Sequence, residues 1–391
     1  MSKMDTVRQF QVKPKIWYGI GSVAKLGQQG YQKVCIVTDE GMVKFGLLKM
    51  VTDVLEAAGI EYHVFPDVKP DPSTDIVEKG LTHILMDRPD VLIALGGGSS
   101  IDTAKGIIYY TYHFKAMFTD REYIVKPQFI AIPTTAGTGS EVTEYAVITD
   151  QKTGTKIPLT DDIMMPDAAI LDPKLIESVP AGATAATGLD VLTHAVESYV
   201  STGNNPFSRC YAAKACELVF KSLLPSYENG HDLDSKASMQ IASSMAGIAF
   251  NSSGLGMAHA IAHGVGAQYH LPHGLACAMV LPYVVAFNGK DERAEYLYKR
   301  LLESVGEPQD AGASAAATLV RLIFELCGKL GIPTCLKASK ADTDNFAEVR
   351  DKLIDRAMAD ATLTTNPVQP TRDEMDAVVD MVPAGDRKSV V

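Results

Sequence analysis

The sequence predicts an α/β domain built on a parallel sheet over residues 1–180, followed by an all-α domain over residues 181–391. Two observations predict this fold class. Short β-branched runs alternate with helix-length amphipathic stretches in the first part. After about Pro180, Ala, Leu, Met and Glu dominate and strand-like runs nearly vanish. The length of 391 residues also favours two cores over one.

The first domain contains four expected strands, each a short and nearly continuous apolar run, at residues 33–38, 61–65, 90–95 and 128–132. Helical spacing of apolar residues fills the stretches at 41–59 and 73–87. Strands that alternate with such helices predict a parallel sheet covered on both faces. In the second part, helical periodicity is found at residues 212–224, 236–250, 293–305 and 314–330.

The composition excludes several classes of partner. A net charge of −11 argues against nucleic acid and anionic membranes. We find neither a signal-peptide pattern nor an apolar stretch long enough to span a bilayer, so we expect a cytoplasmic protein. Packaging inside a protein compartment stays open. The six cysteines form no CxxC pair. They therefore predict reduced thiols, and any metal is expected to be held by nitrogen and oxygen.

A glycine run, GGGSSIDTAK at residues 96–105, directly follows the third strand and begins a helical stretch. Glycines let backbone N–H groups approach a phosphate, and the N-terminus of a helix favours negative charge. Gly97, Gly98, Ser99 and Ser100 are therefore candidates to cradle a pyrophosphate. The run departs from GxGxxG, and a tight turn without a ligand is the alternative interpretation.

A second loop of small residues, PTTAGTGSE at 133–141, follows the fourth strand. Ligands of open α/β sheets bind at the carboxyl ends of strands, and two such loops suit a dinucleotide. Thr134, Thr135 and Thr138 are the candidate contacts. Asp39 ends the first strand, where a carboxylate binds ribose hydroxyls and disfavours a 2′-phosphate. It favours NAD over NADP, although helix capping explains the residue equally well.

Five of the nine histidines fall in two short segments, which suggests a metal site. Asp190 and His194, and His259 and His263, are spaced i,i+4, so each pair shares one helix face. His273 follows Leu271-Pro272, a break that can turn its side chain back towards the preceding helix. Three imidazoles and a carboxylate suit a divalent transition metal. The spacing does not decide between His259 and His263.

Taken together, the motifs closely resemble the iron-dependent, group III alcohol dehydrogenase family. The resemblance rests on GGGSSIDTAK (96–105), PTTAGTGSE (133–141), GLDVLTHAVE (188–197), GMAHAIAHG (256–264) and LPHG (271–274). It implies a dehydroquinate synthase-like fold, with a Rossmann-like NAD-binding domain and a helical metal-binding and substrate domain. The active site is then expected in the cleft between them, in a homodimer or larger homo-oligomer.

The resemblance also implies roles for single residues. It makes Asp190, His194, His259 and His273 the metal ligands and leaves His263 as a proton-relay group. Phe250 is expected in the substrate pocket. The cofactor positions implied are Asp39, Gly97, Gly98, Ser99, Ser100, Thr134, Thr135 and Thr138, with Thr143 and Lys156 as weaker matches. Iron(II) is the metal expected in the family, and the same donors suit zinc.

The function expected is reversible hydride transfer between a short-chain primary alcohol and NAD, working mainly as an aldehyde reductase. The metal would act on the substrate oxygen, and His263 would move the proton. Two alternatives stay open. One is an elimination enzyme of the dehydroquinate synthase type, which also uses NAD and a metal. The other is a non-catalytic NAD-binding assembly protein.

Overall fold

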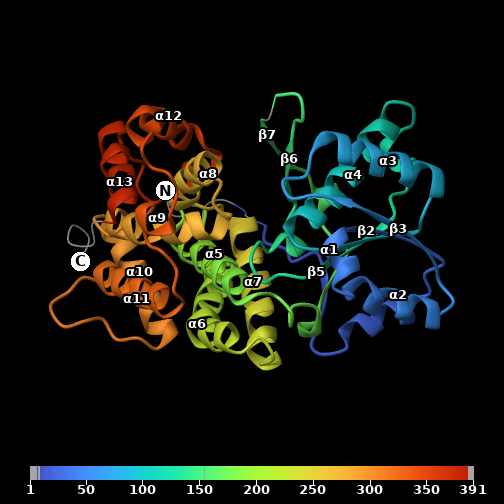
Figure 1. The fold of residues 1–391 in the computed structure, drawn as a ribbon, viewed down its shortest axis with the longest axis horizontal. Helices are drawn as coiled ribbons and strands as arrows, with labels where there is room; N and C mark the ends of the chain where they lie inside the picture. The colour runs from blue at the N-terminus through green and yellow to red at the C-terminus, as the bar shows by residue number, and fades with distance from the viewer. Residues whose placement is uncertain (1–6, 8, 154, 386–391) are drawn as a thin grey trace.

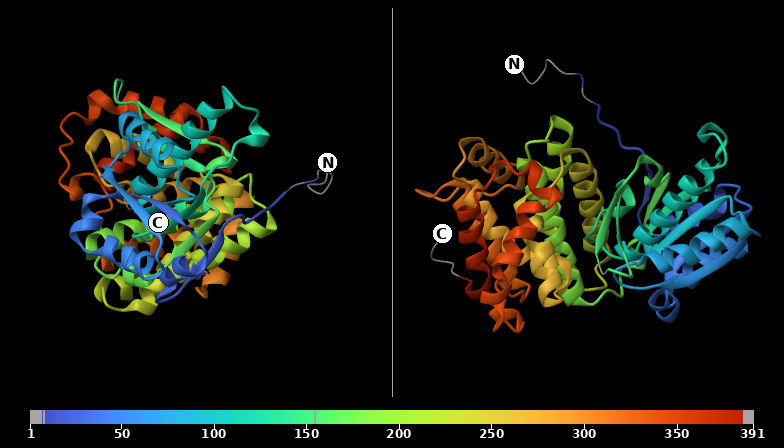
Figure 2. Two further views of the ribbon diagram at one scale, coloured as in Figure 1. Left: turned by 90° about the vertical axis from the view of Figure 1, so that its right-hand side faces the viewer. Right: turned by 90° about the horizontal axis from the view of Figure 1, so that it is seen from above.

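The computed structural model describes residue 7, residues 9–153 and residues 155–385. It has two parts, a sheet flanked by helices and a bundle of helices (Figure 1). Figure 2 shows the same arrangement from above, with the sheet at one end of the molecule and the bundle at the other. The expected combination of an α/β part followed by an all-helical part is therefore confirmed. The division at residue 180 stays a prediction.

The sheet has six strands in the order β1-β8-β5-β4-β2-β3, and every neighbouring pair is parallel. The strands are β1 (Lys15–Tyr18), β2 (Lys33–Asp39), β3 (Glu61–Val68), β4 (Val91–Gly96), β5 (Gln128–Pro133) and β8 (Ala168–Leu171). The four predicted strands are present as β2 to β5. Every residue of β4 is buried, as expected for a central strand covered on both faces.

Helices cover both faces of the sheet, and an apolar core lies under each layer. Leu55 packs in the core on one face, whereas Ile84 and Ile107 pack in the core on the other. A two-stranded antiparallel hairpin of β6 (Tyr145–Thr149) and β7 (Lys156–Thr160) stands apart from the main sheet. The helices are α1 (Glu40–Lys44), α2 (Leu47–Ala57), α3 (Thr74–Asp87) and α4 (Gly98–Ala116).

Between residues 181 and 385 the described chain contains helices and loops but no strand. The helices are α5 (Ala181–Val200), α6 (Pro206–Glu228), α7 (Leu233–Ser253), α8 (Met257–Tyr269), α9 (His273–Asn288), α10 (Glu292–Val305), α11 (Ala315–Lys329), α12 (Phe346–Ala359) and α13 (Arg372–Ala384). Three of the predicted helical stretches lie within α6, α7 and α10, and the fourth, 314–330, extends one residue beyond α11 at each end.

Helix α5 lies at the centre of the bundle and packs against α6, α7 and α9. All its residues from Gly188 to Val200 are buried. A buried helix in such a position holds its polar side chains in fixed places. None of the helices in the described part of the chain is both long and apolar enough to cross a membrane.

Candidate active site

One carboxylate oxygen lies at the centre of three imidazoles. Asp190 Oδ1 is 3.5 Å from Nε2 of His273, 3.8 Å from Nε2 of His259 and 4.0 Å from Nε2 of His194. Both Asp190 Oδ1 and His259 Nε2 are buried and have no hydrogen-bond partner. Burying such atoms unpaired is costly, and a cation between them would satisfy both. The arrangement therefore fits a divalent metal ion.

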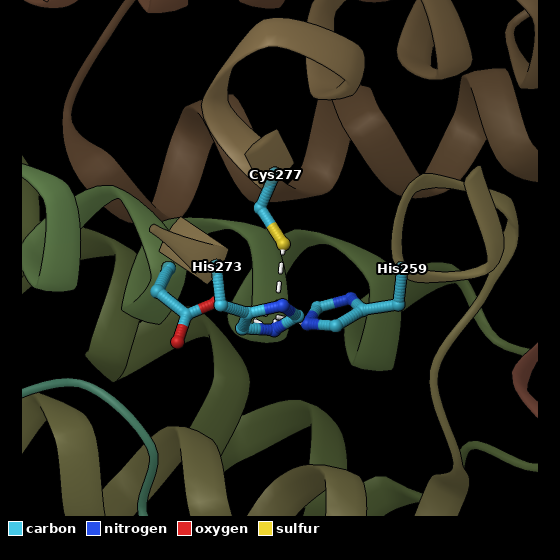
Figure 3. Close-up of side chains that lie close together, drawn as sticks. His259, His273 and Cys277 are labelled. Atoms are coloured by element: carbon cyan, nitrogen blue, oxygen red, sulfur yellow. Dashed lines mark hydrogen bonds and ion pairs between the residues drawn. The ribbon is translucent and has the colours of Figure 1, made fainter. Parts of the chain in front are cut away.

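Three helices bring these side chains together. Asp190 and His194 lie one turn apart on α5, and His259 lies in the first turn of α8. Helix α8 ends at Tyr269, the next residue His270 has a φ of 51° in the left-handed region, and α9 begins at His273. The break expected at Leu271-Pro272 therefore does return His273 to the cluster. In Figure 3 the rings of His259 and His273 point towards each other.

The charges in the cluster favour metal binding. Burial alone would raise the pKa of Asp190, but the neighbouring imidazoles hold it well below its usual range. Burial lowers the pKa of His194 to about 3, and desolvation in the crowded site lowers that of His273 to about 4. An ionised carboxylate and neutral imidazoles are the forms that bind a metal.

His259 differs, because it has a buried acid as a second partner. Its Nδ1 donates a 2.6 Å hydrogen bond to Glu197 Oε2. Glu197 also accepts hydrogen bonds from the backbone N–H groups of Gly256 and Ala258, at 3.1 and 2.6 Å. Burial alone would lower the pKa of His259, yet the sulfur of Cys277 and the Glu197 carboxylate raise it. Glu197 therefore orients the ring so that Nε2 faces Asp190.

Sequence reasoning assigned no role to Glu197, although it lies within the motif GLDVLTHAVE. The signal available was an acidic residue three positions after His194, in a stretch rich in apolar residues. Cys277 was also missed. Its sulfur lies 3.6 Å from His273 Nε2, and it belongs to a group of possible metal ligands with Asp190, His259 and His273. The expectation of nitrogen and oxygen donors alone therefore leaves out one neighbouring sulfur.

His263 lies beside the cluster and has an acid partner of its own. Its Nδ1 donates a 2.8 Å hydrogen bond to Asp360 Oδ2, and its ring stacks on His273 with 5.4 Å between centroids. Burial alone would raise the pKa of Asp360, but the hydrogen bond from His263 lowers it to about 2. Unlike His259, His263 is exposed to solvent.

Phe250, the predicted pocket residue, extends from α7 to the cluster. Its ring lies 4.6 Å from that of His194, centroid to centroid, at an angle of 31°. His194 in turn stacks on His259 at 4.6 Å. The phenyl ring therefore forms an apolar wall against one of the predicted ligands.

The two predicted cofactor loops are neighbours at the carboxyl ends of β4 and β5. The backbone N–H of Thr134 donates to the carbonyl of Gly96 at 3.0 Å. A Cβ atom added to Gly98 would lie 2.9 Å from Thr138 Cγ2, so a side chain at Gly98 would clash with that of Thr138 in the second loop. Gly97 precedes α4, and Gly98, Ser99 and Ser100 form its first turn. Thr135 lies 3.6 Å from the Cβ position of Gly97.

Asp39 makes contacts that support both earlier interpretations. Oδ1 accepts hydrogen bonds from the N–H groups of Gly41 and Met42, at 2.8 and 3.2 Å, and thereby caps α1. Oδ2 lies 3.4 Å from the hydroxyl of Ser100, in the first turn of the predicted phosphate helix. One oxygen thus fixes the carboxylate, and the other faces the glycine loop.

Thr143 and Lys156 have partners within the protein. The Thr143 hydroxyl accepts a 3.0 Å hydrogen bond from Lys105 Nζ, inside a buried polar group that also contains Ser140. Lys156 on β7 forms an ion pair with Asp71. Their assignment to the cofactor stays a prediction.

The loop after β5 docks directly on the helical part. A Cβ at Gly139 would lie 2.8 Å from Gly247 Cα on α7, and one at Gly137 would lie 2.8 Å from Thr187 Cβ on α5. Asp190 follows Thr187 by three residues on α5. The close packing therefore holds the predicted cofactor loop next to the helix that carries two of the predicted metal ligands.

Comparisons with known proteins agree with this arrangement. Family models described as iron-containing alcohol dehydrogenase and as the C-terminal part of the Fe-containing alcohol dehydrogenase family match residues 13–173 and 184–382. The chain is 38% identical to the NADPH-dependent butanol dehydrogenase of Clostridium saccharobutylicum, covering 96% of this chain and 97% of the relative. It is 39% identical to the 1-propanol dehydrogenase PduQ of Citrobacter freundii, covering 92% and 96%.

The fold is shared with solved relatives. Sulfoacetaldehyde reductase from Bifidobacterium kashiwanohense, solved with NAD⁺, superimposes with a TM-score of 0.83 at 28% identity, covering 97% of this chain and 100% of that one. These matches confirm the predicted class of enzyme, a metal- and nicotinamide-dependent alcohol dehydrogenase with iron as the family's metal. The chain belongs to the iron-containing alcohol dehydrogenase family.

Proposed function

We propose that this enzyme interconverts short-chain primary alcohols and aldehydes with NAD(H), and that Asp190, His194, His259 and His273 hold its metal. The observation that carries the proposal is the convergence of three Nε2 atoms on Asp190 Oδ1, within 4.0 Å. When bound, the metal supplies a Lewis acid that polarises the substrate oxygen. Iron(II) is the first candidate, and zinc also suits these donors.

The protein's own groups would orient the reactants and move the proton. Glu197 holds the ring of His259, so its Nε2 stays directed at Asp190. The Asp360 carboxylate accepts a hydrogen bond from Nδ1–H of His263, which leaves Nε2 of His263 free to exchange a proton with the substrate hydroxyl or with water. The exposure of His263 supports a relay to solvent. Phe250 would limit the size of the pocket and exclude water beside His194.

The cofactor is proposed to lie along the two loops at the ends of β4 and β5. Backbone N–H groups at Gly97, Gly98 and Ser99 would bind the pyrophosphate at the N-terminus of α4. Asp39 would accept hydrogen bonds from the adenosine ribose, and its charge supports NAD over NADP. Asp39→Asn tests the preference, because the amide oxygen can still cap α1. We expect the ratio of NADPH to NADH activity to rise, and an unchanged ratio would contradict the role of Asp39.

The substrate class rests on the relatives named for butanol and 1-propanol. Reduction of a short-chain aldehyde is the direction that we propose. The cytoplasmic location and the homo-oligomeric state remain predictions, which fractionation and light scattering would test.

The central experiment combines metal analysis with activity. The chain is purified without oxygen, its metal is measured, and NADH absorbance is followed with ethanal, propanal, butanal and lactaldehyde. The loaded wild type should oxidise NADH, whereas His259→Ala should lose both metal and activity. His231→Ala is the matched control, because His231 pairs with Glu177 away from the cluster. Full metal content and activity in His259→Ala would refute the ligand assignment.

A further inference from the structure

A buried thiol lies within the metal cluster. Cys277 follows His273 by one turn of α9, and its side chain is inaccessible to solvent. Its sulfur, a carboxylate oxygen of Asp190 and one ring nitrogen each of His259 and His273 all lie within 4.8 Å of one another. Figure 3 shows the Cys277 side chain pointing towards the two imidazoles.

The surroundings of Cys277 differ from those of an ordinary core cysteine. Cys216 on α6 is equally buried, but it lies in the large apolar core of the bundle. Cys277 packs in a small cluster with Ala262 and Ala276, and its sulfur also lies 3.6 Å from His273 Nε2. Two of the atoms around it, Asp190 Oδ1 and His259 Nε2, are buried and have no hydrogen-bond partner. These unpartnered atoms are a separate indication that an ion belongs in the same space.

We propose that the sulfur of Cys277 is a further donor to the metal of this site, in addition to the carboxylate and imidazoles. The inference rests on the metal site put forward under the proposed function. On coordination, a sulfur–metal bond would replace the S–H bond, one proton would pass to solvent, and no oxidation state would change. A thiolate is a softer donor than imidazole or carboxylate, so it shifts the preference of the site from iron(II) towards zinc.

Cobalt(II) is the probe that separates this inference from the metal site itself. Co²⁺ gives visible bands when protein donors bind it, and a near-ultraviolet charge-transfer band only when a thiolate is among them. Apo protein is titrated with Co²⁺ as wild type, Cys277→Ala, Cys277→Ser and the control Cys216→Ala. We expect the charge-transfer band in the wild type and in Cys216→Ala, and its loss in both Cys277 variants.

The possible outcomes are distinct. Visible bands without a charge-transfer band in the wild type would overturn the role of Cys277 and leave the metal site standing. A charge-transfer band that persists in Cys277→Ala would also overturn the role of Cys277. A wild type that binds no Co²⁺ would overturn both proposals. Circular dichroism establishes that each variant is folded, and Cys277→Ser preserves the size of the side chain if Cys277→Ala does not fold.

A competition experiment gives a second readout. Apo protein is equilibrated without oxygen in a mixture of Zn²⁺ and Fe²⁺, and the bound metals are then measured. Cys277→Ser should lower the bound ratio of zinc to iron, because a hydroxyl oxygen would replace the softer sulfur. An unchanged ratio would contradict the inference.

Discussion

Replacing Glu197 by Gln should weaken metal binding without touching a proposed ligand. The Glu197 carboxylate accepts three hydrogen bonds, one at Oε1 from Ala258 N and two at Oε2 from Gly256 N and His259 Nδ1. A glutamine has a single carbonyl oxygen, so it can accept either the hydrogen bond made at Oε1 or the two made at Oε2, but not all three. Its NH₂ group would then face an N–H donor in a buried space. The change therefore costs at least one charge-assisted hydrogen bond and leaves a donor unpaired.

The size of the effect follows in two ways. A hydrogen bond to a charged group contributes about 1.5–3 kcal/mol. Loss of a group that orients a metal-binding histidine weakens metal affinity by about 10- to 100-fold, and each tenfold step is about 1.4 kcal/mol. Competition of the apo protein with a chromophoric chelator for Zn²⁺ measures the change in Kd.

Glu141→Gln is the matched control, because Glu141 is also buried and accepts a hydrogen bond from the hydroxyl of Ser244, but has no contact with a predicted metal ligand among its hydrogen bonds. That hydroxyl can rotate to accept from the new amide, so Kd for Zn²⁺ should stay within about twofold of the wild type, well below the change expected at Glu197. A Kd in Glu197→Gln that equals the control would show that Glu197 does not orient a ligand.

Three further predictions follow from the contacts described above. Gly247→Ala should lower the free energy of unfolding by about 1–3 kcal/mol, because its Cβ would lie 2.8 Å from the carbonyl oxygen of Gly139 in the loop after β5. Thermal unfolding measures this change. Gly182→Ala is the control and should be neutral, because no atom from another part of the chain lies within 4 Å of its Cβ position. Burial lowers the pKa of Lys105 to about 8, from 10.5. The folded state therefore binds fewer protons than the unfolded state between these values, and the free energy of unfolding should rise with pH from about 8 to 10.5, by up to about 3 kcal/mol; urea unfolding at several pH values should show this rise in the wild type and not in Lys105→Met. Asp360→Asn removes the charge that holds His263. Because His263 itself remains, kcat should fall by less than the roughly 100- to 10,000-fold that a general acid–base group contributes, while metal content stays unchanged. An unaltered kcat and pH profile would refute the relay.

The alternation of strand-like and helix-like stretches in the first half was sufficient to predict β2 to β5 and the parallel sheet. β2 and β4 are almost entirely buried apolar runs, whereas β3, at the edge of the sheet, is partly exposed. The alternation did not reveal β1 (Lys15–Tyr18) and β8 (Ala168–Leu171), which have only four residues each. Short strands of this kind are held by pairing with a neighbour already in the sheet, as β1 is with β8. Such strands are stable only as part of the assembled sheet, so the local sequence pattern is a poor predictor of them.

At the site, spacing placed Asp190 and His194 correctly on one helix face and identified the break before His273. It did not distinguish His259 from His263, since both lie on the same side of α8. What separates them is the acid that each ring contacts. Glu197 is 62 positions from His259 in the sequence, and Asp360 is 97 positions from His263. The residue pattern of α8 alone cannot predict contacts with residues so far away in the sequence. The different surroundings of the two rings are therefore visible only in the tertiary structure.

The difference between these acids fits the two functions proposed for residues of one helix, α8. Glu197 is buried, with a side chain 3% exposed, and all its hydrogen bonds are made inside the protein. Its partner His259, with a side chain 1% exposed, is therefore held in one orientation, which suits the ligand role proposed for it. The Asp360 side chain is 19% exposed and that of His263 is 45% exposed. A ring in that position keeps a fixed Nδ1 but can exchange protons with solvent at Nε2. The same i,i+4 spacing on α8 can thus supply a fixed ligand on the inside and a proton carrier on the open side.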